Sequence, residues 1–450
     1  MEIINNKYFK ELTKLAEKNS KIAPSFYKEN DVKRGLRNSN GTGVKVGLTH
    51  VGSVKGYELV DNIKRPINGK LYYRGYELSD IVNAFQSEKR KGFEETVFLL
   101  LFGELPNKNE LTQFNEMLGA SRELPNEFTE NMILKIPSKN IMNKLQRSIL
   151  VLYSYDYNPD GISLENILRQ SIKLIAQFPT IISYGYQAKA HYFDKKSLII
   201  HSPDNALSTA ENILHLCRSD NKYTKTEAEI LDLLLVVHAE HGGGNNSAFA
   251  THVVSSSGTD TYSAIAAAVG SLKGPKHGGA NSKVTEMVND IKENCTKWKD
   301  EANLKIYLEK IINKVAFDKT GLIYGMGHAV YTYSDPRAKL LKKEALKLAK
   351  EKDSLDEYNL YSNIEKLTKE IFDKKGKNKI ISANVDLYSG FVYSMLEIPP
   401  ELYTPLFATA RIAGWCAHRI EQLISDDKII RPAYISVNKH RKYKAIIDRK

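Results

Sequence analysis

The chain has 450 residues, of which 42% are hydrophobic and 26% are charged. This composition is typical of a globular protein and excludes a disordered chain, and the length favours two domains over one. The 65 Lys and Arg residues outnumber the 53 Asp and Glu residues, which gives a formal charge of +12. The excess is spread along the chain, with clusters at 374–379 and 439–444. A solvated lysine-rich surface explains it more simply than an acidic partner does.

Cysteine usage and apolar run lengths bear on the cellular compartment. Cys217, Cys295 and Cys416 are far apart and odd in number, which argues against a disulfide framework and a cysteine zinc site and indicates a reducing compartment. The N-terminus has no apolar core of the signal-peptide type. The densest apolar runs, 97–102 and 233–237, are far shorter than the ~20 residues that span a bilayer. We expect a cytoplasmic protein without membrane segments, and no nucleic-acid-binding module is present.

Helical patterns dominate the chain from its beginning. Residues 5–18 have the pattern of an amphipathic helix. The only persuasive strand signal is "KLYYRGY" at 70–76. Residues 94–106 predict a buried helix that Gly103 and Pro106 end, and residues 107–118 predict a helix that Asn107 caps.

The later segments are also helical. The helix that ends in "HAEHGGG" begins with Thr226 and Glu229 at capping-box spacing. The small residues of 259–274 predict a helix that approaches its neighbours closely, either in the core or at a subunit contact. Residues 334–353 predict another long helix. We therefore predict an all-α protein, and the absence of a long linker or internal repeat indicates that any second domain is inserted in the first.

The stretch "HAEHGGGNN" at 238–246 admits three interpretations. His238 and His241 are three residues apart, whereas the zinc-binding helix pattern places its histidines four apart, and His252 is an unsupported third ligand. The glycines after His241 free backbone N–H groups and permit close approach of a ligand. An ordinary end of a buried helix remains the third interpretation.

Two further segments place glycine beside histidine. In "GPKHGGANSKV", His277 lies just before a predicted helix, whose positive end would lower its pKa and keep the imidazole neutral. A neutral imidazole can donate a hydrogen bond to an oxygen that gains negative charge. In "GMGHAVYTYSDPRA", His328 follows two glycines, and Asp335 and Pro336 begin a helix. Arg337 lies just inside that helix and can bind a carboxylate through its forked guanidinium.

Charged residues in apolar segments complete the set. Asp386 lies among apolar residues in "ISANVDLYSGF", where a raised pKa would suit a general base, although a helix cap is the alternative. Arg411 and Arg431 are embedded in apolar stretches and need anionic partners, which internal salt bridges could also supply. Together these residues indicate carbonyl chemistry on a small dicarboxylate or tricarboxylate. No P-loop, dinucleotide fingerprint or serine nucleophile elbow is present.

Three of these segments carry a resemblance to a known family. "GPKHGGAN", "GMGHAVYTYSDPRA" and "NVDLYSGFVY" resemble, in this order, the three active-site signatures of the citrate synthase family. "LYYRGYELSDI", "HAEHGGGNNSAF", "FATARIAGWCAHRIEQ" and "IIRPAYI" are similar to further landmarks of that family. The resemblance extends from about residue 45 to residue 437.

The resemblance implies an all-α homodimer with a large helical domain and an inserted smaller helical domain. The large domain would comprise residues 1–278 and 393–450, with the dimer contacts and the oxaloacetate site. The small domain, residues 279–392, would hold CoA and the catalytic aspartate. Oxaloacetate and acetyl-CoA would be the substrates, with no metal and no permanently bound cofactor.

The same resemblance implies a role for each site residue. Asp386 resembles the base that removes a proton from the acetyl methyl group, His277 the neutral donor to the enol oxygen, and His328 the group that polarises the ketone. The implied site residues are His277, His328 and Asp386 for catalysis, His241, His238, Arg337, Arg411 and Arg431 for oxaloacetate, and Gly325, Met326, Gly327 and Lys379 for CoA. Of these, His238 is expected to be a structural neighbour of the site, and the resemblance implies that Arg431 is contributed by the other subunit.

Two departures from the family pattern leave alternatives open. Many relatives have an acidic residue where this chain has Gly242 and a basic residue where it has Thr332, which puts the CoA phosphate contacts in doubt. A 2-methylcitrate synthase, which uses propionyl-CoA with the same catalytic set, is the nearest alternative. A zinc hydrolase built on His238, Glu240 and His241 and a non-catalytic basic binding protein are more distant ones.

Overall fold

Helices make up most of the structure, as the sequence predicts. The computed structural model describes residues 7–61, 63–374 and 380–449. The chain divides into two compact units. The smaller unit comprises residues 1–47, 61–64 and 431–450, and the larger unit comprises residues 48–60 and 65–430.

The smaller unit contains short elements at the two ends of the chain. These are α2 (Lys7–Ser20), α3 (Pro24–Glu29), and the 3₁₀ turns η1 (Arg34–Leu36) and η5 (Ile446–Asp448). The amphipathic helix predicted at 5–18 is observed as α2, and none of its residues is buried within the described chain. Residues 431–445 form neither helix nor strand and are exposed.

The larger unit contains three strands and most of the helices. The elements are β1 (Gly52–Val60), β2 (Ile63–Tyr73), β3 (Tyr76–Glu77), α4 (Leu78–Ser87), α5 (Phe93–Phe102), α6 (Lys108–Ala120), η2 (Thr129–Leu134), α7 (Ile141–Leu152), η3 (Tyr153–Tyr155), α8 (Leu164–Asp194), α9 (Thr209–Cys217), α10 (Lys225–His238), α11 (Asn246–Ser255), α12 (Thr261–Lys273), α13 (Ala280–Asn294), α14 (Glu301–Ile312), α15 (Pro336–Glu351), α16 (Leu355–Lys374), α17 (Val385–Met395), η4 (Pro400–Leu402) and α18 (Tyr403–Ser425).

Several predicted helix ends are confirmed, because local side chains satisfy the free backbone groups there. Gly103 ends α5 in the left-handed conformation, with φ of 86°. Asn107 caps α6 and forms a capping box with Glu110. Asp335 caps α15, and Pro336 is its first residue.

The predicted beginning of α10 is wrong by two residues. The sequence "TKTEAE" contains the Thr-x-x-Glu spacing twice, and Thr224 with Glu227 forms the capping box in place of Thr226 with Glu229. Glu227 is nearly fully buried and pairs with both Arg218 and Lys352. These two ion pairs, one with Arg218 nine residues earlier and one with the distant Lys352, favour the earlier register, and the Thr-x-x-Glu spacing does not indicate them.

The strand content is larger than predicted. The strand expected at 70–76 is confirmed as far as Tyr73, where β2 ends, and Tyr76 already belongs to β3. Strand β2 begins at Ile63 and lies between β1 and β3 in a three-stranded sheet. β1 contains two glycines and two charged residues, Lys55 and Glu58, which weaken the strand pattern of Val54, Tyr57 and Val60. Arg74 and Gly75 form the tight turn from β2 to β3, both with positive φ (49° and 93°).

Two glycines of this sheet press its backbone against the segment before α15. A β-carbon at Gly56 would lie 2.4 Å from the carbonyl oxygen of Val330, and one at Gly69 would lie 2.1 Å from that of Ser334. Neither position can accept a side chain without displacement of that segment. The sheet therefore fixes the course of residues 330–334.

The small residues of α12 pack as predicted. A β-carbon at Gly270 would lie 2.6 Å from Gln146 Nε2, and Gln146 of α7 donates to the carbonyl of Ala266 at 3.0 Å. Helix α12 also packs against α11 and α18. The close approach of helices is confirmed, and a subunit contact through this helix stays a prediction.

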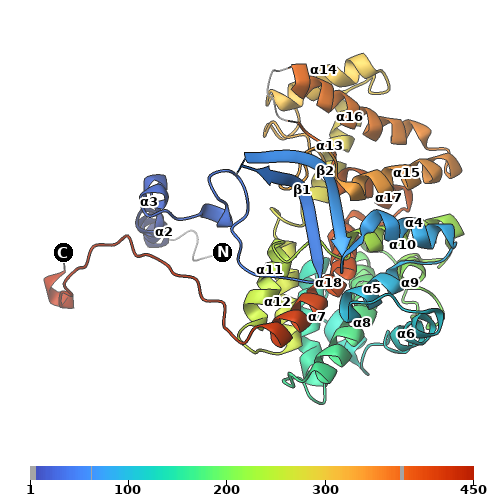
Figure 1. Cartoon of the computed structure of the whole chain (residues 1–450), viewed down its shortest axis with the longest axis horizontal. Helices are drawn as coiled ribbons and strands as arrows, with labels where there is room; N and C mark the ends of the chain where they lie inside the picture. Colours follow the sequence, from blue (N-terminus) through green and yellow to red (C-terminus); the bar gives the residue numbers. More distant parts are fainter. Residues whose placement is uncertain (1–6, 62, 375–379, 450) are drawn as a thin grey trace. The chain divides into compact units, whose positions relative to one another are not determined.

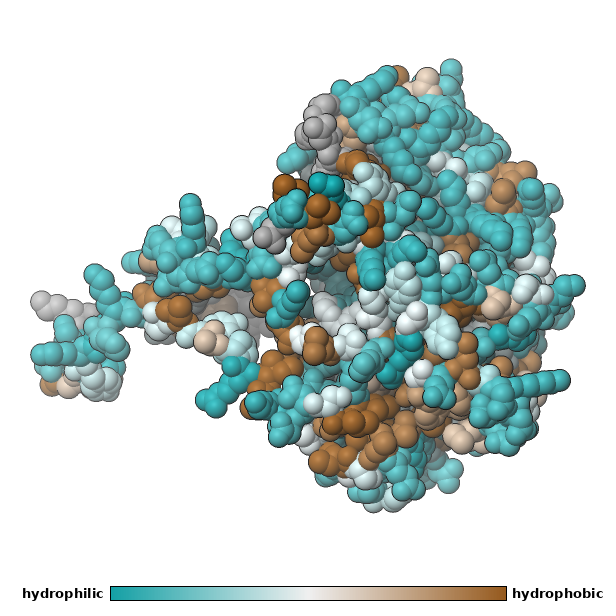
Figure 2. Space-filling view, in the orientation of Figure 1, coloured by the Kyte–Doolittle hydropathy of each residue, from teal (hydrophilic) through white to brown (hydrophobic). Residues whose placement is uncertain are grey.

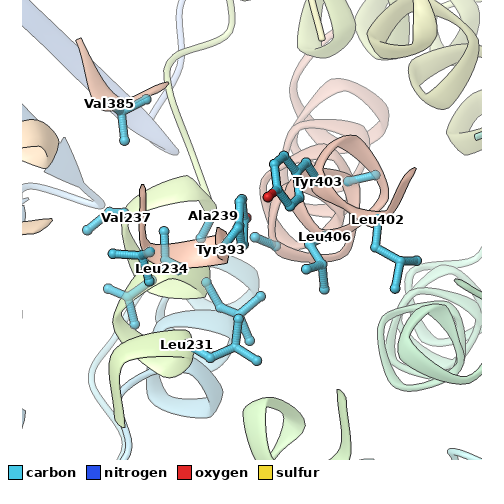
Figure 3. Close-up of a cluster of buried hydrophobic side chains, with 14 of the residues drawn as sticks. Leu231, Leu234, Val237, Ala239, Val385, Tyr393, Leu402, Tyr403 and Leu406 are labelled. Carbon is cyan, nitrogen blue, oxygen red and sulfur yellow. The ribbon is translucent and has the colours of Figure 1, made fainter. Parts of the chain in front are cut away.

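Helix α18 lies at the centre of the larger unit and packs against α5, α8, α10, α11 and α12. Leu406 at its start and Leu231 and Leu234 of α10 belong to one buried apolar cluster (Figure 3). In the same cluster the Tyr403 ring stacks on Tyr393 of α17, with 4.9 Å between ring centroids. This core holds the polar residues of α18 away from water.

Helices α13 to α17 pack chiefly on one another and lie together in Figure 1. Helix α15 also packs against α10. The face shown in Figure 2 is largely hydrophilic, with apolar residues in separate patches. All three cysteines are free. Within the described ranges, no helix has the length and apolar character to cross a membrane.

Candidate active site

A cavity of about 140 Å³ in the larger unit brings together half of the predicted site residues. Six of them line it: His241, His277, His328, Arg337, Asp386 and Arg411. The remaining lining residues are Asn245, Leu272, Gly278, Asn281, Val385, Tyr393, Tyr403, Thr404 and Phe407. The six residues come from positions as distant as 241 and 411, so the fold brings together what the sequence keeps apart.

The other predicted residues have different positions. His238 is buried but is not a lining residue; its carbonyl accepts a hydrogen bond from Arg411 Nε at 2.6 Å, and its ring lies 4.6 Å from that of Phe407. His238 thus supports the arginine, which agrees with its description as a structural neighbour. Arg431 belongs to the smaller unit and is exposed. Lys379 lies outside the described residues.

The segment 325–327 pairs with the chain that leads into α17. Gly327 N donates to the carbonyl of Ser382 at 2.7 Å, and Asn384 N donates to the carbonyl of Gly325 at 2.9 Å. Both glycines have positive φ (81° and 90°), and Met326 forms a β-bridge with Ala383. These bonds set the start of the helix that carries Asp386, while a contact of this segment with CoA stays a prediction.

The two arginines of the cavity differ in their partners. Arg337 forms two hydrogen bonds with Asp335, from Nε at 3.0 Å and from Nη2 at 2.8 Å, and the Asp335 charge raises the pKa of Arg337 against the effect of burial. Asp335 also accepts from Val385 N at 3.2 Å. Arg411 is 1% exposed, and its two Nη atoms have no hydrogen-bond partner among the described residues. Burial lowers the pKa of Arg411 to about 10, so it remains a cation ready for an anionic ligand.

Two histidines lie side by side in the cavity. The rings of His241 and His328 are 5.2 Å apart. Burial, with Arg337 nearby, lowers the pKa of His241 well below its usual value, so this ring is neutral. The Nδ1 atom of His328 accepts from the backbone N–H groups of Val330 and Tyr331 at 3.0 and 3.1 Å. A neutral His328 therefore carries its proton on Nε2 and acts there as a donor.

His241 follows directly on the end of α10. Gly242 has φ of 80°, a conformation that glycine adopts without strain. The Glu240 carboxylate accepts from Gly242 N and bonds His418 Nε2 at 3.0 Å, and the side chains of Glu240 and His418 have no exposed surface. Glu240 is not a lining residue of the cavity. Among the residues that the structure describes, no group of three or more His, Cys, Asp or Glu is placed to hold a metal ion.

His277 has the lowered pKa that its sequence context predicts, for a different main reason. Burial lowers its pKa to about 4, and the Arg411 charge contributes further. The predicted cause was the N-terminus of the following helix, α13 (Ala280–Asn294). The Nε2 atom lies 3.2 Å from Ser247 Oγ. The imidazole is thus uncharged at neutral pH and hydrogen-bonded on the side away from Nδ1.

Asp386 lies in the first turn of α17 and lines the cavity. Burial raises its pKa to about 6, although Arg337 and Arg411 oppose the shift. The alternative that Asp386 is the helix cap is wrong, because Asn384 is the cap and accepts from Asp386 N at 3.0 Å. A carboxylate with this pKa can accept a proton near neutral pH.

Two asparagines of the cavity were not predicted. Asn245 caps α11, and Asn281 donates to Ser389 Oγ at 2.6 Å. Both lie within the quoted motifs: Asn245 directly follows Gly244, and Asn281 is two residues after Gly279. Their position close to those glycines could have indicated them. A glycine run that lets a ligand approach also brings the neighbouring side chains close to that ligand.

The sequence of this chain is similar to those of known proteins. The sequence matches the family described as citrate synthase, C-terminal domain, over residues 40–433. The citrate synthase of Deinococcus radiodurans is 36% identical over 346 residues, which cover 76% of this chain and 85% of that protein. The 2-methylcitrate synthase 2 of Corynebacterium glutamicum is 31% identical over 398 residues, which cover 87% of this chain and 94% of that protein.

A solved structure is similar over almost its whole length. It is the ternary complex of citrate synthase from Thermoplasma acidophilum with carboxymethyl coenzyme A and oxaloacetate. The TM-score is 0.74 at 26% identity, and the match covers 93% of this chain and 99% of that one.

Proposed function

This chain belongs to the citrate synthase family, and from that premise we propose that its cavity binds oxaloacetate for condensation with acetyl-CoA. The chain is an enzyme of the acyltransferase class, and citrate synthase is its function. The observation that carries the assignment of the site is the buried Arg411 guanidinium, whose two Nη atoms have no hydrogen-bond partner among the described residues. It lies in one cavity with Arg337 and with His241 and His277, whose lowered pKa values keep both rings neutral. Such a cavity contains hydrogen-bond donors and cations that an anionic carbonyl compound would satisfy.

The proposed substrate pose follows from these donors. Arg337 and Arg411 bind the two carboxylates of oxaloacetate, and His241 and the Nε2–H of His328 donate to its oxygens. The structure of the Thermoplasma acidophilum enzyme contains oxaloacetate, which supports oxaloacetate as the ligand of this cavity. Arg431 contributes from the other subunit of a homodimer, as the family resemblance implies.

The proposed reaction begins with proton transfer. Asp386 takes a proton from the methyl group of acetyl-CoA, and the neutral His277 donates to the thioester oxygen of the enol that forms. The enol carbon attacks the ketone carbon of oxaloacetate, and His328 gives its Nε2 proton to the new alkoxide. Water then hydrolyses citryl-CoA to citrate and CoA. No metal or permanently bound cofactor takes part in these steps.

We propose the domain division that the family resemblance implies. The large domain comprises residues 1–278 and 393–450, and residues 279–392 form the small domain. The mutual packing of α13 to α17 supports the latter assignment. Backbone groups of 325–327, with Lys379, bind CoA. The enzyme acts in the cytoplasm, in the tricarboxylic acid cycle.

A 2-methylcitrate synthase is the second candidate, and the Corynebacterium glutamicum relative favours it. The two substrates differ by one methylene, which a pocket distinguishes by about 1–3 kcal/mol. Leu272, Val385 and Phe407 supply apolar cavity wall. We expect thiol release from acetyl-CoA that depends on oxaloacetate, with kcat/KM about 10- to 200-fold above that for propionyl-CoA. A preference for propionyl-CoA would select the second candidate, and no release from either would contradict both.

The pH dependence of the reaction should follow Asp386. Because the base must be ionised and its pKa is about 6, kcat/KM should be constant near pH 8. It should fall by about tenfold per pH unit once the pH is below 6. The pKa of His277, about 4, is too low to affect this range. Initial rates at low acetyl-CoA between pH 5 and 8 test this, and a constant rate down to pH 5 would contradict the assigned base.

A further inference from the structure

The only polar side-chain atom of Trp415 serves a residue beside the cavity. Trp415 lies in α18 and has no exposed surface. Its Nε1–H donates to Ser247 Oγ at 3.0 Å. Ser247, in the first turn of α11, is likewise fully buried. A buried indole with its N–H on a buried hydroxyl fixes the position of that oxygen.

Ser247 Oγ has two further neighbours. His277 Nε2 lies at 3.2 Å and Asn245 Oδ1 at 2.8 Å. A hydroxyl has one hydrogen and two lone pairs. The indole N–H can only donate, so it occupies one lone pair. The single Ser247 hydrogen then points either to Asn245 Oδ1, the nearer acceptor, or to His277 Nε2.

The choice between these two partners sets which nitrogen of His277 carries the proton. If Ser247 donates to Nε2, the neutral ring holds its own proton on Nδ1, the nitrogen that does not face Ser247, and can donate from there. If Ser247 donates to Asn245, His277 Nε2 donates to Ser247 and Nδ1 has no hydrogen. Only the first arrangement leaves a donor for an enol oxygen.

Trp415 stabilises the first arrangement more than the second. When Ser247 donates to His277, the indole N–H is the only hydrogen bond that its oxygen accepts. When Ser247 donates to Asn245, the oxygen still accepts one from His277 even without the indole. Loss of the indole N–H would therefore leave Ser247 Oγ without any donor in the first arrangement, but not in the second. A buried acceptor without a donor is unfavourable, so this loss disfavours the first arrangement.

We propose that Trp415 is a positioning residue for His277, acting through the Ser247 hydroxyl to keep the proton of His277 on Nδ1. The inference rests on the proposed role of His277 as the donor to the enol oxygen. It extends the active site by two residues that do not line the cavity. Trp415 touches neither substrate and sets only the state of the imidazole.

Trp415→Phe tests this, because it removes the N–H and keeps an aromatic ring. We expect kcat to fall by roughly five- to tenfold, the scale of one hydrogen bond, and the KM for oxaloacetate to change by less than twofold. The matched control is Trp298→Phe. Trp298 is the other of the two tryptophans, is partly buried, and lies between α13 and α14. That variant should retain the wild-type kcat.

A double-mutant cycle with Ser247→Ala separates the relay from loss of packing. If Trp415 acts through the hydroxyl, Trp415→Phe should change kcat by less than twofold in the Ser247→Ala background. Equal losses of kcat in both backgrounds would overturn the proposal, as would a Trp415→Phe enzyme with kcat within twofold of the wild type. Thermal unfolding of each variant establishes that it is folded.

Nitrogen NMR of ¹⁵N-histidine-labelled protein observes the proton directly. The His277 ring signals are identified by their loss in His277→Asn. They should indicate protonation on Nδ1 in the wild type and a shift towards Nε2 in Trp415→Phe, and identical signals would overturn the proposal. Absence of thiol release by the wild-type enzyme would instead contradict the proposed function, and this NMR comparison remains a test of the relay in that case.

Discussion

Asp386→Asn should lower kcat by roughly 10²- to 10⁴-fold, the range over which a general base contributes to catalysis. Asparagine has nearly the same shape, but its amide cannot take a proton from the acetyl methyl group. Oxaloacetate binding should be unchanged or slightly tighter, because Asp386 is an anion close to Arg337 and Arg411. Thiol release from acetyl-CoA measures the first effect, and calorimetric titration with oxaloacetate measures the second.

The matched control for this prediction is Asp80→Asn, since Asp80 is an exposed acid in α4. It should leave both kcat and oxaloacetate affinity as in the wild type. Turnover by Asp386→Asn within tenfold of the wild type would show that another group removes the proton. A large loss of oxaloacetate affinity would show that Asp386 acts mainly in substrate binding.

Arg411→Leu should weaken oxaloacetate binding by roughly two orders of magnitude without loss of protein stability. Truncation of one partner of a buried charge pair costs about 2–5 kcal/mol of binding free energy. The guanidinium has one hydrogen bond, from Nε to the carbonyl of His238, and lies 4.6 Å from the centre of the Phe407 ring, while its Nη atoms have no hydrogen-bond partner among the described residues. Replacing this buried charge by an apolar side chain should leave the free energy of unfolding unchanged or raise it.

Arg337→Leu provides the comparison, since it should weaken oxaloacetate binding and also destabilise the fold. The change would leave the Asp335 carboxylate, 1% exposed, without its cation. An unpaired buried charge of this kind costs about 3–5 kcal/mol. Thermal unfolding and oxaloacetate titration of both variants test the pair. Equal losses of thermal stability, or unchanged affinity in Arg411→Leu, would contradict the distinction between the two arginines.

Local chemistry explains which parts of the fold could be predicted. Asn107, Asp335 and Gly103 satisfy helix ends within a few residues of themselves, and these ends were predicted correctly. The beginning of α10 and strand β1 were not. The beginning of α10 depends on ion pairs of Glu227 with Arg218 and Lys352. Strand β1 depends on backbone pairing of a segment whose strand pattern is weakened by two glycines and two charged residues.

The site shows the same division. Six lining residues were predicted because each lies in a distinctive local motif, with glycine beside histidine or charge among apolar residues. The supporting contacts were not, since His418 and Trp415 meet Glu240 and Ser247 across 178 and 168 residues of chain. Spacing and periodicity carry no information over such separations. The role of burial in the pKa of His277 likewise depends on packing that the motif does not reveal.

The close approach of Gly56 and Gly69 to residues 330–334 has a kinetic consequence. Gly69 and Ser334 are 265 residues apart. The segment that carries His328 has no helix, and its one β-bridge joins Met326 to the distant Ala383. Its shape is therefore imposed from outside, after a very long loop has closed. Helices form in about a microsecond, whereas contacts between residues that are far apart in the sequence form late. During refolding, most of the helical secondary structure should be in place before this segment and its histidine reach the geometry needed for turnover.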